Sequence, residues 1–182
     1  MSVVTSDEII ALMQQANRLR FENPPQARRL YTEAIEAGRR SGSERELIQA
    51  LKGLGQVERD ENHPNSALLL YEEALTLCRA AGDALLLAHT VRHVGDIHQD
   101  MEREDLAEPC YREALEIYRS NQRTDPLDLA NAIRPFALLK QNAGEKEQAK
   151  DLWAEARDLY STSGVPQGVA ECARRLRLLE DS

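Results

Sequence analysis

The sequence is poor in aromatic residues and has no recognisable cysteine motif. Aromatic side chains make up only 4% of its 182 residues. Valine and isoleucine are also sparse, which argues against a large β-sheet because strands favour β-branched and aromatic residues. Three cysteines, Cys78, Cys110 and Cys172, occur without the CxxC spacing of a metal or redox site. We therefore expect reduced, buried thiols, as in a cytoplasmic protein.

Basic charge, long apolar runs and catalytic motifs are missing as well. The net charge is −8 and the pI is about 5.1, so the chain lacks the basic footprint of a nucleic-acid binder. No apolar run approaches the roughly 20 residues that cross a bilayer, and the segment 1–10 has no basic flank, so we expect no signal peptide. Without a glycine-rich phosphate loop or GxSxG motif, the sequence predicts neither an enzyme nor a cofactor.

One short motif recurs four times in the sequence. It reads QARRLYTEAI from residue 26, SALLLYEEAL from 66, LAEPCYREAL from 106 and QAKDLWAEAR from 148. The aromatic residues Tyr31, Tyr71, Tyr111 and Trp153 are 40, 40 and 42 residues apart, each with alanine four residues before and three after. Such spacing places the ring and both alanines on one face of a helix. The motif therefore predicts a repeated packing face.

Each copy of the motif follows a second amphipathic segment, at 8–20, 47–60, 87–100 and 129–142. Glycines 42, 82 and 164 fit the left-handed position after a helix, and Asn121 lies near the remaining place. Thr5 with Glu8 and Ser43 with Glu46 match capping boxes, and Asp125 precedes a proline as an N-cap does. We predict helix pairs at about 6–42, 43–82, 83–122 and 125–164 and a capping helix at 166–180, all in one domain, 1–182.

The recurring aromatic and small residues resemble the pattern of the tetratricopeptide repeat (TPR). Leu51-x2-Leu54-Gly55 followed by Ala67-x3-Tyr71 fits the family pattern best. The period of about 40 residues, against 34 in the usual repeat, resembles the longer-helix branch that includes kinesin light chains and many bacterial regulators. Glu58, His98 and Lys140 replace the family's second large side chain, which favours wider, solvated helix ends. The resemblance implies an all-α, right-handed α-solenoid that binds proteins or peptides on its concave face and has no catalytic residues.

In such a solenoid the first helix of each pair lines the groove, so the candidate partner-binding residues lie off its packing stripe. Lys52, Arg92 and Arg134 occupy equivalent places and form a predicted basic ladder, which Arg59, Arg174 and Arg177 could extend. Arginine can hold a carboxylate in a bidentate fork, so the ladder suits an acidic or C-terminal peptide. Alternatively, these cations only solvate the wall and pair with nearby acids. The predicted set is Asn17, Lys52, Gln56, Arg59, His89, Arg92, His93, Asp96, Gln99, Asn131, Arg134, Leu138 and Gln141.

Two other functions remain open at this point. His89, His93 and Asp96 share one helical stripe and include the ligand types of a zinc or iron site, although Arg92 adds an unfavourable charge beside them. The first helix carries Ile9, Ile10 and Met13, which favours a self-associating unit. The predicted partner is a protein or peptide, not nucleic acid or a membrane, and the predicted state is a monomer or weak homodimer.

Overall fold

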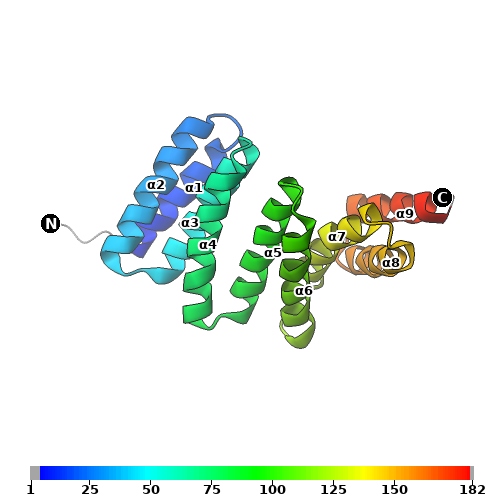
Figure 1. The fold of residues 1–182 in the computed structure, drawn as a ribbon. Coiled ribbons are helices and arrows are strands. Elements are labelled where there is room, and N and C mark those ends of the chain that lie inside the picture. The colour runs from blue at the N-terminus through cyan, green and yellow to red at the C-terminus, as the bar shows by residue number, and fades with distance from the viewer. Residues whose placement is uncertain (1–4, 181–182) are drawn as a thin grey trace. The chain divides into compact units, whose positions relative to one another are not determined.

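The computed structural model describes residues 5–180, and every regular element in that range is an α-helix. The helices follow one another in antiparallel pairs joined by short turns (Figure 1). They are α1 (Ser6–Leu19), α2 (Pro24–Ser41), α3 (Glu44–Asp60), α4 (Pro64–Ala81), α5 (Ala84–Asp100), α6 (Glu104–Ser120), α7 (Pro126–Asn142), α8 (Lys146–Thr162) and α9 (Pro166–Glu180). The predicted all-α fold of four helix pairs and a closing helix is confirmed. Predictions that concern residues 1–4 and 181–182 lie outside the described residues.

The chain divides into two compact units. Unit 1 is Met1–Asp83 and unit 2 is Ala84–Ser182. In unit 1, α1 pairs with α2 and α3 with α4, while α3 also packs on both α2 and α1. In unit 2, α5 pairs with α6 and α7 with α8, α7 also packs on α6 and α5, and α9 lies on α8. Each unit is thus a stack of TPR-like helix pairs, and the single domain over 1–182 stays a prediction.

The recurring motif forms the contact between neighbouring helices, as its spacing predicts. The eight alanines that flank the rings are all 0% exposed, and the rings themselves are at most 5% exposed. Gly55 shows why a small residue precedes each motif, because a Cβ atom there would lie 2.7 Å from the ring of Tyr71. That distance is shorter than side chains tolerate, so glycine allows the ring to lie directly on α3.

The three glycines that were predicted to end helices have the left-handed conformation. The φ angles of Gly42, Gly82 and Gly164 are 71°, 70° and 68°. The corresponding prediction for Asn121 is wrong, since its φ of −100° and ψ of 114° are extended. There the chain leaves α6 in an extended conformation, and the Asn121 side chain instead accepts a hydrogen bond from the backbone N–H of Arg123.

The predicted side-chain caps at the helix starts form in two of three places. Thr5 and Glu8 form the expected capping box at α1, and Asp125 accepts a hydrogen bond from the backbone N–H of Leu127 at 2.8 Å. Ser43 makes no side-chain cap at α3. Its hydroxyl lies 2.8 Å from that of Ser41, which donates a hydrogen bond to it. The capping box predicted at Ser43 is therefore wrong, because its hydroxyl contacts the preceding turn instead.

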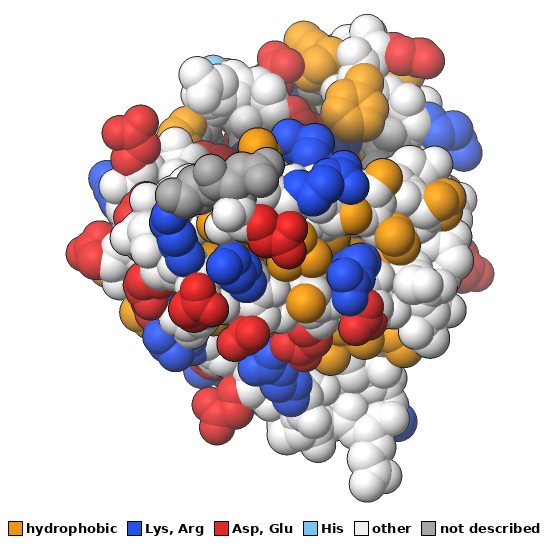
Figure 2. Space-filling view, turned by 90° about the vertical axis from the view of Figure 1, so that its right-hand side faces the viewer, with side chains coloured by type: hydrophobic (Ala, Val, Ile, Leu, Met, Phe, Trp, Pro, Cys, Tyr) orange, Lys and Arg blue, Asp and Glu red, His pale blue; other side chains and the backbone are white. Residues whose placement is uncertain are grey.

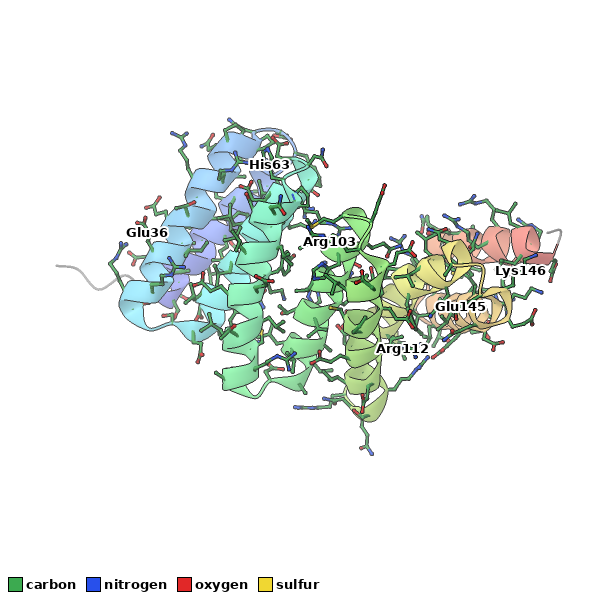
Figure 3. All side chains as sticks on the ribbon, viewed as in Figure 1. Glu36, His63, Arg103, Arg112, Glu145 and Lys146 are labelled. Atoms are coloured by element: carbon green, nitrogen blue, oxygen red, sulfur yellow. The ribbon has the colours of Figure 1, made fainter. Side chains whose placement is uncertain are left out.

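The prediction of solvated helix ends is wrong in unit 1, where Glu58 is only 8% exposed. The Arg28 guanidinium donates hydrogen bonds to both of its carboxylate oxygens, at 2.5 and 3.3 Å. His63 Nδ1 lies 3.1 Å from the same carboxylate, and Figure 3 shows His63 at the turn between α3 and α4. A carboxylate can be buried here because α2 and the turn supply its partners.

The same prediction is wrong in unit 2, where Lys140 is only 2% exposed. Its ammonium donates hydrogen bonds to Glu108 at 2.7 Å and to Glu145 at 2.9 Å. It also lies 5.4 Å from the centre of the Phe136 ring, and Glu145 is labelled near the α7–α8 turn in Figure 3. This ion cluster joins α6, α7 and the start of α8, so it contributes to packing and is not a solvated rim.

The carboxylates of Glu58 and Glu108 in these two ion clusters predict how the stability depends on pH. Burial alone raises the pKa of Glu58, but the hydrogen bonds from Arg28 and His63 outweigh it and the pKa is lowered. The hydrogen bond from Lys140 likewise lowers the pKa of Glu108. A lowered pKa in the folded state stabilises the fold above the ordinary glutamate pKa of about 4.3, and this stabilisation is lost as the pH falls through the folded-state value.

We therefore expect the urea midpoint to fall steeply between about pH 5 and 2, measured by circular dichroism. Glu58→Gln and Glu108→Gln are each expected to give a lower midpoint at neutral pH and a flatter decline on acidification. The control is Glu147→Gln, because the Glu147 side chain is 88% exposed. If all three variants keep the wild-type slope, these ion clusters do not control the acid response.

Candidate functional site

The first helices of the pairs in unit 2 are α5 and α7, and α9 takes the same place after α8. Arg92, Arg134 and Arg174 each lie eight residues after the first residue of their helix, and we call them the arginine row. Arg134 Nη1 donates a hydrogen bond to Glu171 of α9 at 3.1 Å, so side chains of α7 and α9 are in contact. Both run antiparallel to α8 and are therefore parallel to each other. We call the side of α5, α7 and α9 that carries the row the first-helix face of unit 2.

The members of the predicted basic ladder differ in their exposure and in their ion-pair partners. Arg92 has a side chain only 14% exposed and bonds to Asp96 on its own helix at 2.8 Å. Arg134 is 51% exposed. Lys52 belongs to unit 1 and is 8% exposed. The ion pair of Arg92 with Asp96 fits the alternative that these cations only pair with nearby acids. The guanidinium of Arg134, in contrast, stays accessible. The ladder across all three residues stays a prediction.

The arrangement around Arg92 does not favour a metal site. Arg92 Nη2 lies 2.6 Å from His93 Nε2, and because a guanidinium can only donate, Nε2 must accept. The imidazole proton is then on Nδ1, which lies 3.2 Å from Asp96 Oδ2. The lone pair that would bind a metal is already used. Among residues 5–180, no three His, Cys, Asp or Glu side chains are grouped so as to hold a metal ion.

Several predicted groove residues serve as hydrogen-bond acceptors for buried aromatic side chains. The Tyr111 hydroxyl donates to Gln99 at 2.7 Å and lies 3.1 Å from Asp96. The Trp153 indole donates to Gln141 at 3.0 Å. In both pairs with glutamine the acceptor precedes the ring by 12 residues, a spacing that sequence reasoning could have recognised. Gln99 and Gln141 therefore orient the rings of Tyr111 and Trp153, a role that their prediction as groove residues did not include.

Asn131 and Tyr160 form a third such pair, on the first-helix face. The Tyr160 hydroxyl donates to Asn131 Oδ1 at 2.8 Å. Burial raises the pKa of Tyr160, which keeps the phenol protonated and donating. Asn131 itself is exposed, so its amide N–H groups can donate to a ligand. Glu171, the partner of Arg134, was absent from the predicted set because its proximity depends on how α7 and α9 pack.

The predicted residues of unit 1 are less concentrated. Gln56 donates to Asp60 at 3.3 Å, Arg59 is half-buried and Asn17 is exposed. A surface hollow in this unit is lined by Gln15, Arg18, Leu19 and Glu22, none of which belongs to the predicted set. Unit 1 thus offers no cluster of predicted residues comparable to Asn131 and Arg134 in unit 2.

A leucine follows the arginine by one turn in two of the first helices of unit 2. Leu138 of α7 and Leu178 of α9 each lie twelve residues after the first residue of their helix, where α5 has Asp96. Leu138 packs partly against the core of the unit, while Leu178 is 49% exposed. Leu178 was not among the predicted site residues, because the apolar stripe of the last helix contains the core-facing Leu179 and not Leu178.

Comparison with known families and structures gives the class of this protein. The tetratricopeptide repeat family model matches residues 11–80, and the same helix-pair arrangement continues through unit 2. The resemblance predicted from the sequence is therefore confirmed over residues 11–80, and the described helices of the whole chain have a TPR-like fold. No curated protein matches the sequence significantly.

Solved structures with the same fold cover nearly the whole chain. Aspartyl phosphate phosphatase F from Bacillus subtilis superposes with a TM-score of 0.84 at 12% identity, over 93% of this chain and 45% of that one. BtubC (BKLC) from P. vanneervenii gives 0.66 at 16% identity, over 98% and 92% of the two chains. A protein of Podosopora anserina assigned as a kinesin light chain with nearly identical TPR-like repeats gives 0.71 at 12% identity, over 94% of both. At these identities the likeness concerns the fold alone.

These comparisons support the general role and leave the specific one open. Tetratricopeptide repeats generally act as protein-binding scaffolds and are typically non-catalytic. The present chain spans less than half the length of the phosphatase, so the activity named for that protein does not transfer to it. Among the described residues, no helix is long and apolar enough to cross a membrane.

Proposed function

We propose that the protein binds a protein or peptide partner on the first-helix face of unit 2, through an acidic side chain or a C-terminal carboxylate. The observation that carries this proposal is the state of Arg134, whose side chain is 51% exposed and held by Glu171 at 3.1 Å. In this proposal the protein is a cytoplasmic adaptor and not an enzyme.

Arg134 has the chemistry that such a partner requires. A guanidinium carries five N–H donors in a planar fork that matches a carboxylate. One of its nitrogens contacts Glu171, which leaves donors for a second acceptor. An exposed ion pair of this kind contributes little stability, about 0–1 kcal/mol, so a ligand carboxylate can replace Glu171 at small cost. Asn131, three residues earlier on α7, adds amide donors on the same face.

A charge reversal of Arg134 tests the proposal. Binders are first captured and identified with the wild-type protein, and the Kd of each purified binder is then measured by calorimetry for the variants. We expect Arg134→Glu to weaken binding by roughly 10-fold or more, because it replaces the donor by a like charge facing the ligand.

The matched control is Arg119→Glu on α6. Arg119 is 47% exposed and is paired with Glu155 at 2.6 Å, so it has similar exposure and a similar ion pair but lies on a second helix. We expect its Kd to stay within about twofold of wild type, as for a charge outside the contact. Equal weakening by both variants would show that net charge, and not this face, governs binding.

Self-association is the second candidate function. The observation in its favour is apolar exposure in unit 1, where Phe21 is 78% exposed and Ile10 is 38% exposed. Exposed apolar side chains of this size mark interaction surfaces when they occur together. Light scattering over a range of concentrations tests this candidate, and a monomeric mass at every concentration would contradict it.

A further inference from the structure

Four residues after the arginine, α5 has an aspartate whereas α7 and α9 each have a leucine. The arginines of the row differ accordingly in their partners and in their exposure. On α5, Asp96 lies four residues after Arg92 and bonds to it at 2.8 Å. Leu138 and Leu178 stand four residues after Arg134 and Arg174. Residues four apart share a helix face, so in α7 and α9 an apolar side chain takes the place of the intrahelical acid. Arg134 accordingly reaches across to Glu171, and Arg174 is exposed.

Arg134 with Leu138 and Arg174 with Leu178 occupy equivalent positions on two parallel helices, α7 and α9. On each helix the leucine lies four residues after the arginine, about 6 Å further along the axis, and Arg134 connects the two helices through Glu171. Figure 2 faces the side on which Figure 1 draws α8 and α9, and it shows hydrophobic and Lys/Arg side chains next to one another on that surface. Basic and apolar side chains are thus neighbours on this surface, with acidic side chains among them.

Leu178 is not needed for the core of unit 2. On α9 the buried side chains are Cys172 at 0% and Leu179 at 6% exposure, whereas Leu178 is 49% exposed. Covering an exposed leucine beside accessible cations requires a ligand that is apolar at one point and acidic at the next. A purely acidic ligand would use the arginines and leave Leu178 in water.

We propose that the α7–α9 part of this face takes a peptide that carries an acidic and an apolar side chain about one helical turn apart. The carboxylate bonds to Arg134 and Arg174, and the apolar side chain lies on Leu138 and Leu178. In an extended peptide this spacing corresponds to residues two apart, at about 3.3 Å per residue, and in a helical one to residues three or four apart. The inference rests on the proposed function and adds the chemistry of the ligand.

Selection from random twelve-residue peptides displayed on phage, with the full chain as target, tests this inference. We expect the enriched peptides to combine Asp or Glu with Leu, Ile, Val or Phe at one of these spacings. Synthetic copies, measured by fluorescence polarisation, are expected to bind Leu178→Ser at least fivefold more weakly than wild type. Leu106→Ser is the matched control, because Leu106 is 45% exposed but lies on α6, a second helix. It is expected to bind like wild type.

The outcomes separate this inference from the proposed function. Enrichment of acidic peptides without an apolar preference, or an equal loss in Leu178→Ser and Leu106→Ser, overturns the inference and leaves the proposed function standing. Enrichment of no peptide at all overturns both. Both leucines are exposed, and circular dichroism of each variant verifies that the helical fold is intact.

Discussion

Replacing Trp153 by alanine is expected to lower the free energy of unfolding by about 3–5 kcal/mol. Trp153 is 0% exposed and is the largest of the fully buried side chains. Its indole also donates a hydrogen bond to Gln141 at 3.0 Å. The substitution leaves a large cavity between α7 and α8 and an unpaired amide oxygen, and both effects destabilise the fold.

Denaturation followed by circular dichroism measures this loss, because Trp153 is the single tryptophan of the chain and its fluorescence disappears with it. Trp153→Phe is the companion variant. It keeps a ring in the packing column but removes the N–H donor, so its expected loss is smaller, about 1–2 kcal/mol. If Trp153→Ala lost less than about 1 kcal/mol, the aromatic column would not be the main contact of this helix pair.

Replacing Lys140 by alanine is expected to lower the free energy of unfolding by about 2–3 kcal/mol. Breaking a fully buried ion pair typically costs about 3–5 kcal/mol. The cost is lower here because the partners Glu108 and Glu145 are 29% and 48% exposed and can regain water. Burial alone lowers the pKa of Lys140, but the hydrogen bonds to both glutamates outweigh it and the pKa is raised. The ammonium is therefore charged in the folded state, and its removal leaves two carboxylates facing each other.

Lys140→Met separates the charge of this side chain from its packing. Methionine keeps most of the apolar stem against Phe136 and removes only the ammonium, so it is expected to lose clearly less stability than alanine. The free energy of unfolding of both variants is measured by urea denaturation at neutral pH. Equal losses would mean that the ammonium, and not the stem, accounts for the contribution of Lys140.

The helix pairs could be predicted because they depend on local patterns. A ring flanked by alanines at −4 and +3 defines a packing face whatever lies around it, and a glycine after a helix marks its end through its own backbone freedom. The failures at Ser43 and Asn121 have a common cause. Each side chain had another neighbour within reach, a serine hydroxyl in one case and a nearby backbone N–H in the other.

The partners of the arginines in the candidate site could not be predicted from local patterns in the same way. Arg92 and Arg134 look alike in the sequence, yet one is held by Asp96 on its own helix and the other reaches Glu171 on the next first helix. The first contact is visible as an i, i+4 pair. The second joins residues 37 apart and exists only because α8 brings α9 back beside α7.

Repeat spacing, packing columns and most helix ends thus follow from the residue pattern alone, since each depends on side chains within one or two turns of each other. The burial of Glu58 and Lys140, the aromatic hydrogen bonds to Gln99 and Gln141, and the exposure of Arg134 and Leu178 follow from packing between helices. Glu58 and Lys140 are buried with their charges because another helix or turn supplies the counter-ions. That condition is met by the arrangement of helices in space, and no single segment of the sequence contains it.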